Sequence, residues 1–147
     1  MEKVPQAKFA FERYFIRESK ISRSVSDISD KSANTKLGKF GLDVSAFGII
    51  SESQRKFQLD LNVIIKENKN RFVAEVKARG LYKFDENQTK DTLRNYFYIN
   101  APAILFPYLR AYIATLTSLS GMEPIHIPTL NLTSLGEELK KNTKTIE

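Results

Sequence analysis

The chain has 147 residues, of which 41% are hydrophobic and 11% aromatic, a composition typical of one globular domain. It contains no cysteine, which excludes disulfides, thiol catalysis and thiolate metal sites. Its net charge of +6 lies in residues 1–90, which hold 18 Lys or Arg against 12 Asp or Glu, so an acidic partner would meet the first two thirds of the chain.

The first half of the chain predicts a β-sheet. Alternating apolar and polar residues predict four strands, at residues 9–18, 40–46, 56–65 and 72–84. A serine-rich connection over residues 19–38 separates the first two strands and is long enough to suggest a function of its own. The polar loop Lys66–Asn70 has hairpin length, and Gly80 interrupts the alternation as a bulge would. The short links between the last three strands favour an antiparallel sheet with one buried face.

The second half predicts helices. Residues 89–99 predict a short amphipathic helix, and residues 99–119 a long helix that is apolar on nearly every side and ends at Gly121. One stripe of the long helix carries large side chains at steps of four and three: Leu105, Leu109, Tyr112, Leu116 and Leu119. A return punctuated by prolines then leads to a short C-terminal helix, with Thr133 as its N-cap.

This order of elements predicts an α+β fold, a four-stranded antiparallel sheet followed by two helices, one of them long and apolar. We expect one domain over residues 1–147, with a core at about 9–140 and a frayed tail at 142–147. The apolar helix contains Arg110 and two prolines, whereas a membrane span needs about 20 uninterrupted apolar residues. The first twenty residues hold five basic side chains and no apolar run, so we expect a cytoplasmic protein without membrane insertion.

The sequence offers no catalytic or cofactor-binding constellation. The single histidine, His126, lies between two isoleucines, and Glu123 is the one ionisable residue near it in sequence. A metal site or a catalytic base needs more partners than that. Gly38 and Gly41 do not make a phosphate-binding loop. The sequence therefore predicts a protein that is not an enzyme and that holds neither a cofactor nor a metal.

The most specific pattern lies between Asn100 and Asn131, beginning with the run NAPAILFPYLR. Its members are Pro102, Leu105, Phe106, Pro107, Tyr108, Arg110, Gly121 and Pro124. This pattern resembles the signature of the SecB export chaperones, and the resemblance extends from about Phe9 to Lys140. There are two departures: Leu132 stands where the family usually has phenylalanine, and this chain is basic where typical members are acidic.

The resemblance implies an ATP-independent chaperone that holds unfolded or aggregation-prone polypeptides in hydrophobic grooves. It also implies a homotetramer, built as a dimer of dimers. Carried over by position, it assigns eight residues to the client-binding groove: Val25, Ile28, Leu42, Val44, Leu116, Leu119, Ile125 and Ile127. It assigns three residues to the oligomer interface: Leu93, Tyr96 and Phe97. Tyr108 and Arg110 of the pattern are expected to fix the start of the long helix, and the other members of the pattern are expected to be structural.

The sequence leaves the client and the partners open. The client is either a preprotein for export or a dedicated client such as an antitoxin, and the basic charge argues against contact with a SecA-type motor.

Burial between subunits explains any one of the large apolar residues as well as a client groove does. The alternative function is single-stranded nucleic-acid binding on a basic, aromatic sheet face. That alternative is disfavoured because the cations alternate with Asp60, Glu67 and Glu75.

Overall fold

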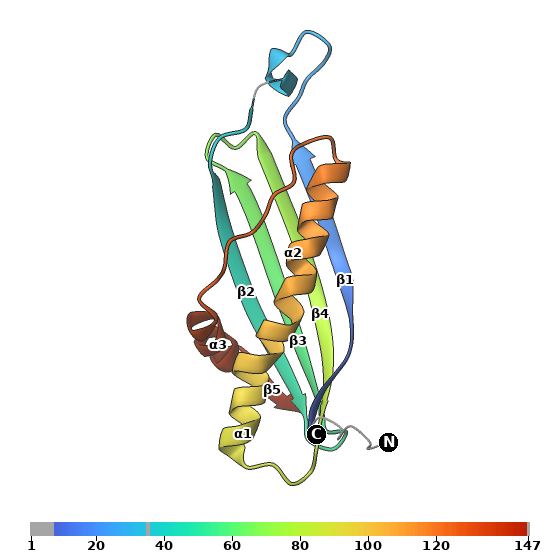
Figure 1. The fold of residues 1–147 in the computed structure, drawn as a ribbon, viewed down its shortest axis with the longest axis vertical. Coiled ribbons are helices and arrows are strands. Elements are labelled where there is room, and N and C mark those ends of the chain that lie inside the picture. Colours follow the sequence, from blue (N-terminus) through green and yellow to red (C-terminus); the bar gives the residue numbers. More distant parts are fainter. Residues whose placement is uncertain (1–7, 35, 147) are drawn as a thin grey trace, which may run out of the picture.

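The structure is a computed structural model that describes residues 8–34 and 36–146. Its strands are β1 (Phe9–Arg23), β2 (Phe40–Ser51), β3 (Lys56–Glu67), β4 (Phe72–Phe84) and β5 (Thr143–Ile146). Its helices are α1 (Lys90–Asn95), α2 (Ala101–Leu119) and α3 (Leu132–Lys141), with a 3-10 turn at Lys31–Asn34 and a π-helical turn at Tyr96–Asn100. Figure 1 shows the long helix α2 lying along one face of the sheet.

The strand order in the sheet is β1-β4-β3-β2-β5. The pairs β1–β4, β4–β3 and β3–β2 are antiparallel, as the short links predict, so the α+β class and the antiparallel core of the sheet are confirmed. The prediction of four strands was wrong, because β5 adds a fifth strand parallel to the end of β2. The tail that was expected to fray over residues 142–147 supplies this strand at residues 143–146. Four residues are too short to show an alternation in the sequence.

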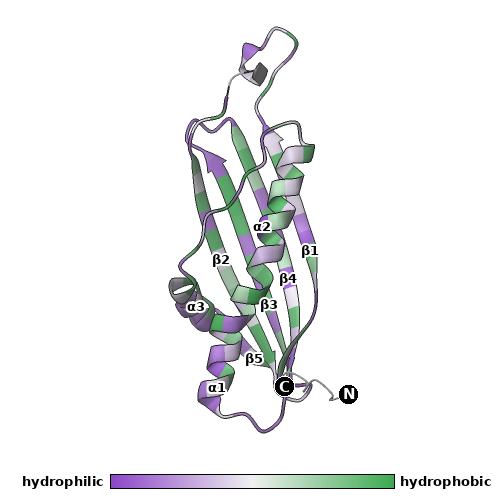
Figure 2. Cartoon of the chain, in the orientation of Figure 1, coloured by the Kyte–Doolittle hydropathy of each residue, from purple (hydrophilic) through white to green (hydrophobic). Residues whose placement is uncertain are grey.

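The core lies between the sheet and α2 (Figure 2). Every second residue of β3 from Phe57, and of β4 from Phe72, is buried on the face that α2 covers. The buried side of α2 runs in steps of four through Leu105, Leu109 and Ile113. Leu105 and Leu109 of the predicted stripe thus belong to the core, whereas Leu119 at its end, a predicted groove residue, is 82% exposed.

The two predicted helices form one continuous rod, joined by the π-helical turn. Pro102 has no N–H to donate to the carbonyl of Tyr98, so the regular helical ladder is interrupted where the π turn passes into α2. Phe97 points from this turn into the core, where its ring stacks on Phe57 at 4.5 Å and meets Phe84 edge-on at 5.1 Å. This aromatic contact anchors the junction between the two helices to the sheet.

Three local predictions can be compared with the structure. The register of β4 passes through Gly80 without a shift, so the predicted bulge there was wrong, and the irregularities lie in β1 after Phe11 and Ile16. The N-cap of α3 is Asn131 and not the predicted Thr133. The side-chain oxygen of Asn131 accepts the backbone amides of Thr133 and Ser134. The end of the long helix at Gly121 is confirmed, since its φ of +89° suits glycine.

Candidate functional site

A cavity of about 560 Å³ opens between the crossover, which connects β1 to β2, and the segment that follows α2. Its apolar lining comes from both segments and from the start of β2: Leu37, Phe40, Met122, Pro124 and Ile125. Its polar rim comprises Arg23 and Lys36 on the crossover side, with Glu123 and His126 on the other. We call this the crossover cavity. It is the largest of the hollows described here, and its walls come from segments that are far apart in the sequence.

The wall after α2 is held by Thr117, a buried polar residue inside the helix. Its hydroxyl donates to the carbonyl of Ile113 at 2.8 Å and accepts the amide of Ile125 at 2.9 Å. Two residues further on, Ile127 is buried in the core, at 2% exposed. The segment is therefore fixed at both points, while the side chain of Ile125 lines the cavity.

The opposite wall is held by a buried ion pair between Glu67 and Arg71. The Glu67 carboxylate accepts from Arg71 Nε at 2.8 Å and from Arg71 Nη2 at 2.6 Å. It also accepts the backbone amide of Gly38 at 2.6 Å, which fastens the end of the crossover to the β3–β4 turn. The Arg71 guanidinium holds the pKa of Glu67 down at about 2, against the opposing effect of burial. The sequence reasoning missed the contact between Gly38 and Glu67, because these two residues lie 29 positions apart.

The middle of the crossover is folded around two aspartates. Asp30 accepts the amides of Ser26 and Ser32, each at 2.9 Å, and its hydrogen bonds with these two serines, first of all that of the Ser32 side chain, lower its pKa to about 2. Asp27 accepts the amide of Ser29 at 2.8 Å. The turn that results carries a fully exposed Ile28. In the sequence these serines and aspartates indicate only an irregular polar connection. In the structure they build a turn that exposes the apolar side chain of Ile28.

A second hollow, of about 240 Å³, lies between β2 and the start of α3. The predicted groove residues Leu42 and Val44 line it, together with Leu130 and Leu135. Leu42 and Val44 follow Phe40 at alternate positions of β2 and so share its face of the sheet. The crossover cavity and this second hollow are therefore joined along one strand.

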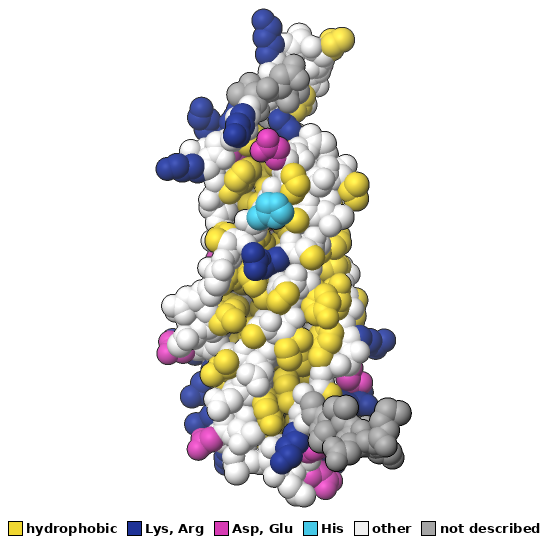
Figure 3. Space-filling view, in the orientation of Figure 1, with side chains coloured by type: hydrophobic (Ala, Val, Ile, Leu, Met, Phe, Trp, Pro, Cys, Tyr) yellow, Lys and Arg dark blue, Asp and Glu magenta, His cyan; other side chains and the backbone are white. Residues whose placement is uncertain are grey.

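The structure divides the eight predicted groove residues. Ile125, Leu42 and Val44 line the two hollows. Val25 and Ile28 are exposed on the crossover, and Leu119 is exposed at the end of α2. The remaining two are withdrawn from the surface: Leu116 is half-buried against the core, and Ile127 is buried within it. Figure 3 shows hydrophobic side chains along this face, with the single histidine among them in the upper part of the view.

The three predicted interface residues also separate. Leu93 and Tyr96 are half-buried, and the ring of Tyr96 stacks on Phe9 at 5.0 Å. Phe97 is 3% exposed and belongs to the core of its own chain.

The residues of the sequence pattern divide in the same way. Pro102, Leu105 and Phe106 are buried, while Pro107, Tyr108, Arg110, Gly121 and Pro124 are exposed. Tyr108 packs on Phe11 and Tyr14 of β1, with ring centroids 5.7 Å and 4.7 Å apart. The sequence reasoning did not foresee this half-exposed aromatic cluster.

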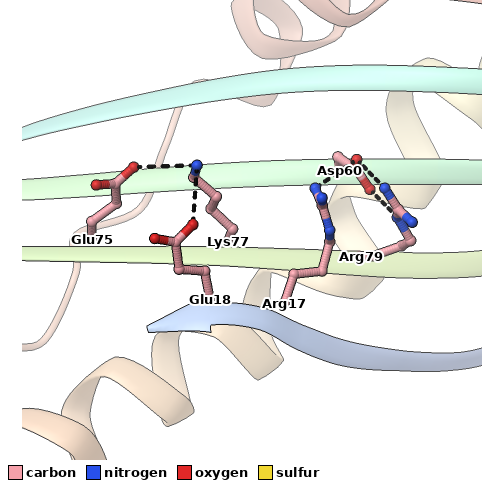
Figure 4. A network of polar contacts seen from close by, with 6 residues as sticks. All are labelled: Arg17, Glu18, Asp60, Glu75, Lys77 and Arg79. Carbon is pink, nitrogen blue, oxygen red and sulfur yellow. Dashed lines mark hydrogen bonds and ion pairs between the residues drawn. The ribbon is translucent and has the colours of Figure 1, made fainter. Parts of the chain in front are cut away.

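The opposite face of the sheet is covered by ion pairs rather than by free charge (Figure 4). The side chains drawn come from β1, β3 and β4: Arg17, Glu18, Asp60, Glu75, Lys77 and Arg79. Asp60 accepts from Arg79 at 2.7 and 2.9 Å and from Arg17 at 3.4 Å. Lys77 lies between Glu18 and Glu75, at 3.2 and 3.8 Å. This pairing leaves the centre of that face close to neutral.

Residues 8–34 and 36–146 contain no candidate for a membrane span or for a metal site. No helix in these ranges is long and apolar enough to cross a membrane. The same residues contain no group of three or more His, Asp or Glu side chains placed to hold a metal ion.

Comparison with known proteins identifies the family of this fold. The family model described as preprotein translocase subunit SecB matches residues 2–142. The protein-export protein SecB of Acidithiobacillus ferrooxidans is 23% identical over 136 residues, which cover 90% of each chain. That of Anaplasma phagocytophilum is 30% identical over 69 residues, 46% of this chain and 44% of the relative.

A solved structure has the same fold. It is a Mycobacterium tuberculosis SecB-like chaperone in complex with a ChAD peptide from the HigA1 antitoxin. The TM-score is 0.66 at 14% identity, covering 84% of this chain and 88% of the other. SecB proteins are chaperones and not enzymes. With the SecB model matching residues 2–142, the chain belongs to the SecB family.

Proposed function

We propose that this protein is an ATP-independent chaperone of the cytoplasm that holds unfolded or aggregation-prone polypeptide segments. The observation that carries the proposal is the apolar path from the crossover cavity along Phe40, Leu42 and Val44 to the second hollow. Exposed Ile28 and Leu119 extend the apolar surface near its crossover end. A groove of this kind suits clients of different sequence, because apolar burial needs no exact polar match.

The proposed binding mode uses side-chain anchors. Burying one large apolar client side chain in a hollow contributes about 1.5–3 kcal/mol to the free energy of binding. Two or three such anchors therefore offset the conformational entropy that an extended segment loses when it binds. The crossover cavity takes the first anchor, against Phe40 and Ile125, and the second hollow takes another, against Leu42 and Val44. Ile127 supports the wall from behind, and a client would reach it if the segment after α2 moved.

We also propose that the chain assembles as a homotetramer, a dimer of dimers. The exposed side of α2, a helix that the structure describes throughout, carries Ala103, Pro107 and Ala111, with Arg110 as its one charged residue. Such a side favours burial against another subunit. Leu93 and Tyr96 are the interface residues on the preceding turn, and Phe97 holds that turn in position from inside. A mass near four times the 16.8 kDa chain by light scattering at micromolar concentration is expected, and a monomer would contradict the proposal.

The identity of the client has two forms within this proposal, a preprotein for export or a dedicated client such as an antitoxin. The Mycobacterium tuberculosis neighbour was solved with an antitoxin peptide, which supports testing the second form directly. The paired charges around Asp60 and Lys77 leave no strongly acidic sheet face for a SecA-type motor. The same pairing leaves the centre of that face without the free cations that the nucleic-acid alternative needs.

The direct test is an aggregation assay. A reduced, unfolded model protein is diluted into buffer with and without the full chain, and light scattering is followed over time. We expect this protein to suppress aggregation at a near-stoichiometric ratio of chaperone to client, without ATP. Added single-stranded DNA should not change the suppression. Equal aggregation with and without this protein would refute the chaperone function.

A further inference from the structure

The crossover cavity has an uneven distribution of charge around its rim. Arg23 and Lys36 lie on the rim itself. Lys39 immediately precedes Phe40, and the alternation along the strand directs its side chain to the other face of β2. The amide of Asn68 donates to the carbonyl of Lys39 at 2.9 Å, which brings the β3–β4 turn, with Lys66 and Lys69, to the same end of the molecule. Figure 3 shows Lys and Arg side chains gathered at that end.

These lysines are not neutralised within the part of the chain that the structure describes. The carboxylate nearest to them in sequence, Glu67, is buried and already paired with Arg71. Asp27 and Asp30 accept amide hydrogens inside the crossover turn. No ion pair of the described residues involves Lys36, Lys39, Lys66 or Lys69, whereas the cations at the centre of the far sheet face are paired.

We propose that the polypeptide segment that occupies the crossover cavity carries one large apolar side chain flanked by Asp or Glu. This inference rests on the proposed chaperone function and names the class of client. The apolar lining from Leu37, Phe40 and Ile125 takes the anchor. The rim cations Arg23 and Lys36, at the basic end of the molecule, meet the acidic flank. A flank rich in Lys or Arg is repelled there, because Glu123 on the opposite wall is a single carboxylate against the two rim cations.

The test measures binding of three dye-labelled nonapeptides by fluorescence anisotropy. All three carry the same single Phe anchor at the centre, and their flanks are Asp, Gln or Lys. At about 50 mM salt we expect the Asp peptide to bind about tenfold more tightly than the Gln peptide, as two exposed ion pairs provide, and the Lys peptide to bind more weakly than both. At about 1 M salt the three affinities should converge, because the Debye length falls to about 3 Å.

A charge-matched pair of variants locates the effect. Lys36→Gln removes one charge on the cavity rim, and Lys90→Gln removes one charge at the start of α1. We expect the first variant to lose much of the preference for Asp while binding the Gln peptide as before. The second variant should keep the preference.

Three outcomes would overturn the inference. Equal affinities for the three peptides, or a preference for the Lys peptide, would refute the acidic flank and leave the chaperone function standing. If a single-stranded oligonucleotide displaced the Asp peptide, with an affinity that falls steeply as the salt concentration rises, the basic rim would be assigned to nucleic acid. Failure of all three peptides to bind would refute the chaperone function together with this inference.

Discussion

The hydroxyl of Tyr82 donates a buried hydrogen bond of 2.7 Å to the carbonyl of Ala101, and so ties the end of β4 to the first turn of α2. Gly80 makes this possible, since a Cβ atom there would lie 3.0 Å from the Tyr82 ring. Burial raises the pKa of Tyr82 above its ordinary value. One polar contact within an apolar layer thus positions the start of α2 on the sheet.

Replacing this tyrosine tests that contact. Tyr82→Phe should lower the free energy of unfolding by about 1 kcal/mol, the net value of one buried hydrogen bond. Because the folded-state pKa of Tyr82 is raised, its contribution is present below pH of about 10 and is lost as the pH rises further. Urea unfolding at neutral and alkaline pH measures both effects. Tyr108→Phe is the control, because Tyr108 is half-exposed and should change stability by less than about 0.5 kcal/mol.

The contact of α3 with the π-helical turn depends on a glycine. A Cβ atom on Gly136 would overlap the carbonyl oxygen of Tyr98, which is backbone and cannot move aside. Gly136→Ala should therefore destabilise the fold by about 1–3 kcal/mol, as overpacking does. Gly41→Ala is the matched control, since a Cβ atom there meets nothing nearer than 3.9 Å. Equal thermal midpoints for the two variants would contradict the close approach of α3.

The ion pair behind the crossover cavity predicts a pH dependence. The pKa of Glu67 is lowered from 4.5 to about 2, so its stabilising effect is complete above pH 4.5 and is lost as the pH falls from 4.5 towards 2. In Glu67→Gln this acid-induced loss should be reduced, and the amide of Gly38 should exchange its hydrogen faster at neutral pH. Hydrogen exchange of the crossover measures the effect. Unchanged protection at Gly38 would show that the pair does not hold this wall.

The exposed apolar residues near the crossover end should be dispensable for folding and needed for binding. Ile28→Ser combined with Leu119→Ser should leave stability within about 0.5 kcal/mol, because both side chains are exposed. The double variant should suppress aggregation of an unfolded client several-fold less well. Phe47→Ser, which removes an exposed side chain from the other face of the sheet, is the control and should retain full activity. The same loss in both variants would place client binding elsewhere.

Much of the fold could be predicted from the chain because its signals are local. The alternation from Phe57 to Ile65 is sufficient to place β3, and the positive φ at Gly121 agrees with the predicted end of α2. Features made by distant residues could not be predicted. Glu67 looks like one more surface charge in the sequence, because the amide of Gly38, which it accepts, lies 29 residues away.

The same limit applies to the groove. Alternate isoleucines at 125 and 127 predict one exposed face, yet Ile127 is buried, because the hydroxyl of Thr117 fixes how the segment lies. Thr117 is not recognisable in the sequence, where it resembles any polar residue on a helix.

Arg71 has a further consequence for the crossover. Its carbonyl accepts the amide of Ser24 at 2.9 Å, and its guanidinium donates to the carbonyl of Lys36 at 3.4 Å, so both ends of the loop meet at one residue (Figure 1). The cost of closing such a loop grows slowly with its length. Residues between these two contacts can therefore be inserted, deleted or exchanged during evolution without disturbing the sheet, so relatives can change what they hold while keeping the same scaffold.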